Sequence, residues 1–179
     1  MQREYEELQK MPYGLKLGQA DRLPACLRIC AGTDGSVTLL LELMTGEHVS
    51  VETLKQHIIA SDERTSELLD IPIGEPVNER TVLLRAGDVV YVHARSLAPI
   101  KRMPEGVKED LMRADIPIGR IMQKHNIESR REIVRMEILK SDLFGEECMA
   151  LSRAYRIIHN HKTLIRINET FPIDDRWDV

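Results

Sequence analysis

Two charged residues lie on predicted strand faces that are otherwise apolar, one near the C-terminus and one in the middle of the chain. In TLIRINETFPID, the alternation of side chains places Glu169 on the same side as Ile167 and Phe171. In NERTVLLR, the same alternation places Arg80 on the side of Val82. A carboxylate in apolar surroundings needs a partner or loses its charge, and a buried guanidinium needs acceptors. These two side chains are therefore the first candidates for chemistry.

Two interpretations of this pair are compatible with the pattern. Glu169 and Arg80 could form an ion pair with each other inside the fold, which would be a structural role. Alternatively, they could line a cavity in which Arg80 binds a ligand carboxylate through two parallel hydrogen bonds and Glu169 transfers a proton. The pattern alone leaves both interpretations open.

The start of the predicted helix VTLLLELM is a further candidate, for anion binding. Ser36 is a good N-cap for this helix, and Gly46 ends it. The backbone N–H groups of Val37 and Thr38 lie in the first turn, where they have no acceptor within the helix and where the helix dipole is positive. They could bind an anion, or they could serve only in ordinary capping.

Several other arginines are candidate anion ligands. Gly119 and Arg120 follow a predicted helix start, where a residue without a side chain lets an anion approach the backbone N–H groups. Arg95 in HARSLAP and the adjacent Arg130 and Arg131 are the others. Taken singly, each of these arginines also fits a solvated surface charge.

Familiar catalytic motifs are missing from the sequence, which contains no GxxxxGK[ST], HExxH, GxSxG or CxxC. His159 and His161 lie two residues apart at a predicted hairpin tip and would need further ligands to hold a metal ion. Cys26 and Cys30 are four residues apart, and the chain has three cysteines in all. We therefore expect free thiols and no metal site.

Periodicity, caps and turns predict an antiparallel sheet with helices inserted between the strands. Two long hairpins stand out, one turning in AGD and one turning at His159–His161. Ser61 is expected to cap a short helix over DERTSELL, and the first twenty residues to form a short charged helix and a loop. The remaining predicted helices are 24–31, 103–115 and one after Pro117, and the remaining predicted strands are 48–59 and 132–140. We expect an α+β fold with a sheet of about six strands.

Length and composition limit the classes of protein. A chain of 179 residues fits one domain, which we expect to span 1–179 with 1–35 as an N-terminal helical or loop extension. A net charge of −4 argues against a general nucleic-acid binder. The charged N-terminus and the lack of a long apolar run predict a cytoplasmic protein without a membrane span. A monomer and a homodimer are equally compatible with the sequence.

The ordered motifs resemble the chorismate pyruvate-lyase family, in its archaeal-type branch. The resemblance covers residues 36–173 and rests on GSVT, RTVLLRAGDVVYVHARSLAP, DIPIGRIM, LSRAYRII and KTLIRINETFPI. It implies a six-stranded antiparallel sheet with helices covering an enclosed ligand cavity. It also implies conversion of chorismate to 4-hydroxybenzoate and pyruvate without a cofactor.

The resemblance also implies roles for individual residues. The family's arginine falls on Arg80, its glutamate on Glu169, the leucine before its Gly-Arg pair on Ile118, and a contact from the covering helix near Val37. Chorismate carries two carboxylates on a compact ring, so Arg80 would clamp a carboxylate, the amides near Val37 would donate, and Ile118 would form an apolar wall. Apolar neighbours would keep Glu169 protonated, so that it could act as the general acid for the departing enolpyruvyl group.

Two alternatives remain. REIVRMEILKSD and the long C-terminal hairpin also resemble the UTRA effector-binding domains of GntR-type repressors, which bind small molecules without catalysis. Such repressors carry a winged helix of roughly 60–70 residues, and the region before Ser36 is shorter than that. A stand-alone binding protein, or an enzyme acting on another aromatic or enolpyruvyl carboxylate, is compatible with the same residues.

Overall fold

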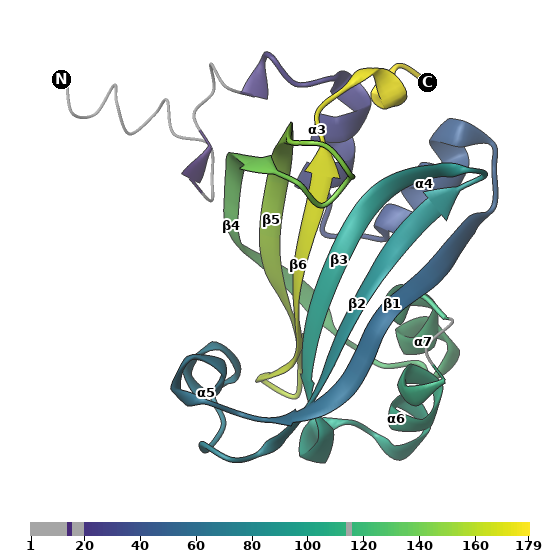
Figure 1. Cartoon of the computed structure of the whole chain (residues 1–179). Helices are drawn as coiled ribbons and strands as arrows, with labels where there is room; N and C mark the ends of the chain where they lie inside the picture. The colour runs from purple at the N-terminus through teal and green to yellow at the C-terminus, as the bar shows by residue number, and fades with distance from the viewer. Residues whose placement is uncertain (1–13, 16–19, 114–115) are drawn as a thin grey trace, which may run out of the picture.

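The computed structural model describes residues 14–15, 20–113 and 116–179, and this part of the chain contains a six-stranded antiparallel sheet (Figure 1). The strands follow the order β1-β2-β3-β6-β5-β4, so the two predicted hairpins meet in the centre where β3 pairs with β6. The strand bounds are β1 Val49–Ala60, β2 Pro76–Ala86, β3 Val89–Pro99, β4 Arg130–Ser141, β5 Cys148–His159 and β6 Lys162–Pro172. The predicted α+β fold is confirmed.

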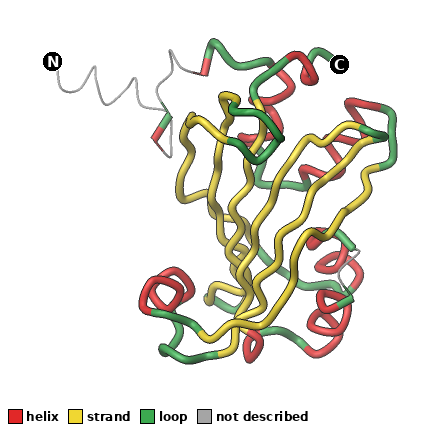
Figure 2. Tube along the Cα trace, in the orientation of Figure 1, coloured by secondary structure: helices red, strands yellow, loops and turns green. Residues whose placement is uncertain are grey.

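The helices cover the two faces of the sheet unequally (Figures 1 and 2). We call the face that carries Glu169 the inner face and the opposite one the outer face. Apolar residues of α3, α4, α6 and α7 pack with the inner face in the main core, whereas α5 forms a small separate cluster with Val77 and Leu97 on the outer face. The helix bounds are α3 Ala25–Gly32, α4 Val37–Thr45, α5 Glu63–Leu69, α6 Glu105–Met112 and α7 Ile118–Lys124.

Both predicted hairpins are present, and each turns through at least one residue with positive φ. The β2–β3 turn contains Gly87 with φ 55°, and the β5–β6 turn contains Asn160 and His161 with φ 50° and 62°. In the β5–β6 turn, positive φ at both central residues matches the turn to the right-handed twist of the strands, and in the β2–β3 turn Gly87 alone takes the positive φ. The hairpins place Arg80 and Glu169 on the same face of the sheet, from two segments far apart in the sequence.

The predicted cap of α4 is confirmed, and that of α5 is wrong. Ser36 Oγ accepts a hydrogen bond from Leu39 N at 3.2 Å, and Gly46 ends the helix with φ 70°. At α5 the cap is Asp62, whose Oδ1 accepts from Thr65 N at 2.7 Å. Ser61 instead donates to the carbonyl of Pro72 at 2.8 Å and so holds the loop that follows the helix.

The predicted N-terminal extension is described only in part. The helix predicted in the first twenty residues lies outside the described residues, which in this region are 14–15 and 20 onward. The α3 part of the extension belongs to the core, because Leu27 and Cys30 are fully buried in it. None of the helices in the described ranges is long and apolar enough to cross a membrane.

Candidate active site

A pocket lies between the inner face of the sheet and the N-terminal ends of α4 and α7. Its cavity volume is about 60 Å³, within about 570 Å³ of atom-free space that includes solvent at its mouth. From the helices and the turns before them come Gly35, Ser36, Val37, Thr38, Pro117, Ile118 and Gly119. From the strands come Val51, Arg80, Val82, Leu84, Ala94, Ser96, Arg131, Tyr155, Ile167 and Glu169.

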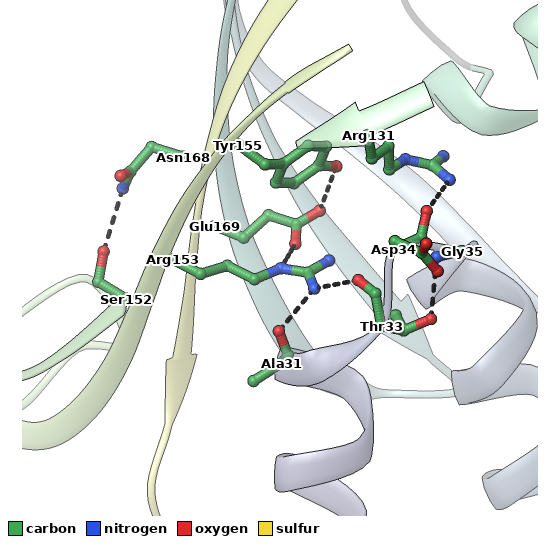
Figure 3. Close-up of polar contacts among 10 residues, drawn as sticks. All are labelled: Ala31, Thr33, Asp34, Gly35, Arg131, Ser152, Arg153, Tyr155, Asn168 and Glu169. Atoms are coloured by element: carbon green, nitrogen blue, oxygen red, sulfur yellow. Dashed lines mark hydrogen bonds and ion pairs between the residues drawn. The ribbon is translucent and has the colours of Figure 1, made fainter. Parts of the chain in front are cut away.

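Glu169 is held from two sides by residues of the neighbouring strand β5 (Figure 3). Arg153 lies directly opposite Glu169 in the β5–β6 register, and its Nε is 2.7 Å from Glu169 Oε2. The hydroxyl of Tyr155 donates to Oε1 at 3.0 Å. The side chains of Glu169 and Arg153 are 6% and 1% exposed, so this is a buried ion pair.

Arg153 also connects the sheet to the loop between α3 and α4. Its Nη1 donates to the carbonyl oxygens of Ala31 and Thr33, each at 2.8 Å (Figure 3). Its Nη2 is buried and has no hydrogen-bond partner among the described residues. One guanidinium therefore positions both the carboxylate in the pocket and the loop that leads to the Ser36 cap.

The electrostatics of this cluster follow from burial and from the ion pair. Burial, followed by the nearby carboxylate of Glu169, raises the pKa of Tyr155, so the phenol keeps its proton and donates it in a hydrogen bond. Burial alone would lower the pKa of Arg153, but Glu169 and Tyr155 outweigh it and raise the pKa. Burial also raises the pKa of Cys30 to about 12, so this residue is a buried thiol, as predicted.

The expected environment of Glu169 needs correction. The alternation placed Glu169 among apolar residues, and one interpretation paired it with Arg80. Among the described residues, the ion pair of Glu169 is with Arg153 and not with Arg80.

Arg80 lies two strands away from Glu169 and is only 2% exposed. Its Nη1 donates to the carbonyl of Ile116 at 3.2 Å, and its Nη2 to Thr53 Oγ1 at 3.4 Å. The guanidinium is thus held between β1 and the segment that leads into α7. This fixes its position at one side of the pocket.

Arg131, which the sequence left open between an anion ligand and a solvated surface charge, lines the pocket. It lies at the start of β4 and donates through Nη1 to the carbonyl of Asp34 at 3.0 Å (Figure 3). A Cβ atom added to Gly119 would lie 3.4 Å from Arg131 Nη2, so Gly119 leaves this guanidinium its space. The available signal was that Arg131 shares a strand face with Ile133.

The other residues predicted for the site divide into two groups. Val37, Ile118 and Gly119 line the same pocket as Arg80 and Glu169. Arg95 points to the outer face, since its strand neighbours Ala94 and Ser96 point inward, and its Nε donates to Glu79 at 2.6 Å.

Arg120 also lies outside the pocket lining. Its Nη2 is 2.5 Å from Glu42 Oε1 on α4, so it connects the two helices that cover the pocket. In the ranges that the structure describes, no group of three or more His, Cys, Asp or Glu residues is arranged to hold a metal ion.

The fold defines a class of α+β domains built on a six-stranded antiparallel sheet. The chain is similar to the effector domain of PhnF from Mycobacterium smegmatis, with a TM-score of 0.62 at 14% identity over 78% of this chain and 90% of that one. It is also similar to the ligand-binding domain of a GntR-family regulator from Bordetella bronchiseptica, with a TM-score of 0.58 at 13% identity over 72% and 85% of the two chains. At these identities the likeness concerns the fold alone.

Sequence comparison then gives the family. Residues 32–177 match the family described as "Chorismate pyruvate-lyase Rv2949c-like", and the chain belongs to this family. The chain is 35% identical to "Putative lyase MJ0807" of Methanocaldococcus jannaschii over 157 residues, or 82% of this chain and 77% of that one. It is 29% identical to the chorismate pyruvate-lyase of Mycobacterium leprae over 161 residues, or 84% and 75% of the two chains. The resemblance to this lyase family seen in the motifs is confirmed.

Proposed function

We propose that this protein converts chorismate to 4-hydroxybenzoate and pyruvate in the pocket under α4 and α7. The observation that carries the proposal is the buried Glu169 in the central strand β6, in a pocket lined on either side by an arginine. Membership of a chorismate pyruvate-lyase family supports the same reaction. The chain would act as a single domain, without a cofactor.

The two arginines suit the two carboxylates of chorismate. Arg80 on β2 and Arg131 on β4 are each two strands away from Glu169 on β6. At a spacing of about 4.8 Å between strands, each lies on the order of 10 Å to one side of the glutamate strand. We assign one ligand carboxylate to Arg80 and the other to Arg131, with N–H groups of the first turn of α4 as further donors.

The remaining walls suit the ring of the substrate. Val37, Val82, Ile118 and Ile167 line the pocket with hydrocarbon. Such walls exclude water and strengthen the electrostatic contacts of the charged groups among them.

The reaction needs one proton to move, and Glu169 would move it. As the C3–O bond breaks, its electrons leave with the enolpyruvyl oxygen, and the C4–H electrons form the C3–C4 double bond that completes the aromatic ring. The carboxylate of Glu169 accepts the C4 proton and returns it to the enolpyruvate, which becomes pyruvate. When it returns the proton, Glu169 acts as the general acid for the leaving group, the role that the sequence assigned to it, whereas in the first transfer it acts as the base. The contact with Arg153 Nε, 2.7 Å from Oε2, holds the carboxyl group of Glu169 in place for both proton transfers.

The test is to mix the purified protein with chorismate and to follow both products. We expect 4-hydroxybenzoate by chromatography and pyruvate by coupling to lactate dehydrogenase, in equal amounts. Chorismate that stays intact at high protein concentration would overturn the proposal.

A non-catalytic effector-binding domain is the second candidate, because the similar solved structures are effector and ligand-binding domains of transcriptional regulators. In that case Arg80, Arg131 and Glu169 would only bind a small carboxylate. Saturable binding of chorismate without release of pyruvate would favour this candidate. Turnover of a different aromatic or enolpyruvyl carboxylate would instead favour a related enzyme.

A further inference from the structure

A second hollow lies on the outer face of the sheet, away from Glu169. It extends from α5 across β3, β6 and β5 to β4, and its cavity volume is about 410 Å³. Because side chains alternate along a strand, Arg166 and Asn168 of β6 point into it while Ile167 and Glu169 point to the inner pocket. Figure 3 shows Asn168 and Ser152 on the side of the strands opposite to Glu169. We call this hollow the arginine groove, after Arg64, Arg95, Arg135 and Arg166 in its lining.

Two of these arginines are already neutralised and two are not. Arg95 forms an ion pair with Glu79, and Arg135 forms one with Glu137. Arg64 and Arg166 form no ion pair or hydrogen bond through their side chains with any described residue. The groove therefore holds two positive charges without counter-charges in the described chain.

The surroundings of Arg166 disfavour its positive charge when no ligand is bound. Arg166 is half-buried, and burial, followed by the guanidinium groups of Arg156 and Arg64, lowers its pKa. Each of these causes disfavours the charged form. An anion between Arg64 and Arg166 would remove the repulsion and would accept charge-assisted hydrogen bonds from both.

The rest of the lining indicates what such an anion would carry. Ser152 Oγ accepts a hydrogen bond from Asn168 Nδ2 at 3.3 Å, so polar groups lie next to Arg166. Leu68, Leu97 and Leu139 supply apolar walls nearby. A cationic pair beside a hydrocarbon wall suits a ligand with both a charged group and an apolar body.

We propose that the arginine groove is a second binding site, for an organic anion with a phosphate or carboxylate group on an apolar body. The site is separate from the lyase pocket because the sheet lies between them, and it does not depend on the proposed reaction.

Phenyl phosphate is a suitable probe, with inorganic phosphate as the head group alone. By isothermal titration calorimetry we expect saturable binding of phenyl phosphate to the full chain, and weaker binding of inorganic phosphate. Arg166→Gln and Arg64→Gln should each weaken the binding of phenyl phosphate about tenfold, the effect of losing one charge-assisted hydrogen bond. Lys55→Gln is the matched control, because it removes an exposed positive charge from β1, outside the groove, and should leave binding unchanged.

Three results would overturn the proposal. The first is the absence of saturable binding to the wild-type chain. The second is equal affinity of Arg166→Gln, Arg64→Gln and Lys55→Gln for phenyl phosphate, with unchanged melting temperatures showing that all three are folded. The third is loss of binding in Arg131→Gln but not in Arg166→Gln, which would show that the ligand binds in the pocket that contains Glu169.

Discussion

Glu169 forms its ion pair with Arg153, the residue directly opposite it on the neighbouring strand, and both side chains are buried. Removing one member of such a pair leaves an uncompensated charge in the core. We expect Arg153→Leu to lower the free energy of unfolding by about 3–5 kcal/mol. The double variant Arg153→Leu/Glu169→Leu should recover most of this loss, because neither charge then remains. Urea unfolding of the three chains measures both effects, and a double variant less stable than Arg153→Leu would contradict the ion-pair argument.

Glu169→Gln tests the proton transfer without removing the side chain. The amide oxygen can still accept from Arg153, so the fold should persist, while the group can no longer carry a proton. We expect turnover of chorismate to fall about 10²–10⁴-fold, the usual contribution of positioned proton transfer. Steady-state kinetics with circular dichroism as the folding check measure this, and an unchanged rate would remove Glu169 from the mechanism.

Arg131 and its neighbour Arg130 form a natural pair of variants. Both carry the same charge, but Arg131 lines the pocket, whereas Arg130 is exposed and paired with Glu132. Arg131→Gln should lower kcat/KM for chorismate about 10–100-fold, through the loss of a charge-assisted hydrogen bond to one carboxylate. Arg130→Gln should change it less than twofold. Equal effects of the two variants would show that only the overall charge matters.

The local features of the site could be predicted from the sequence. Capping rules predicted Ser36 and Gly46 as the two ends of α4. The alternation in each hairpin placed Arg80 and Glu169 each on the apolar face of its own strand, and both line the pocket. These features depend on neighbours within a few residues. They therefore did not require knowledge of how the strands pair.

The partner of Glu169 could not be predicted in the same way, because it depends on a bulge. Near the turn, His159 pairs with Lys162, and counting back from there would place Ser152 opposite Glu169. A register shift between Ile157 and Ile158 moves the pairing by one residue and brings Arg153 opposite instead. Arg131 was a candidate that the sequence did not separate from Arg130, since β4 has its own register shift after Ile133.

A buried carboxylate, that of Asp110, connects the covering helices α6 and α7, and its contribution to the stability of the fold depends on pH. Asp110 accepts from Lys124 Nζ at 2.7 Å and lies 2.7 Å from His125 Nε2, and these two contacts hold the pKa of Asp110 below its usual value. A lowered folded-state pKa adds stability above the unfolded value of about 3.9 and loses it as the pH falls through the folded value. Asp110→Asn should therefore destabilise the protein near neutral pH and have a smaller effect near pH 3. Urea midpoints at both pH values measure this. Asp142→Asn, at an exposed turn, serves as the control.

Gly106 on α6 lies against the ring of His125, which follows α7. A Cβ atom at this position would lie 2.6 Å from His125 Cε1 and 2.8 Å from Nδ1, distances that real Cβ atoms do not tolerate. Gly106→Ala should therefore lower the free energy of unfolding by about 1–3 kcal/mol through overpacking, although alanine favours a helix by about 1 kcal/mol.

Gly32, the last residue of α3, provides the matched control for Gly106→Ala. A Cβ atom added there would have no heavy atom within 4 Å, so Gly32→Ala should be neutral or slightly stabilising. Because α7 begins with Ile118 and Gly119 of the pocket, Gly106→Ala should also raise KM for chorismate more than Gly32→Ala does. Thermal unfolding and steady-state kinetics of the two variants measure these effects. Equal stability of the two variants would mean that His125 moves aside without cost and that α6 does not position the start of α7.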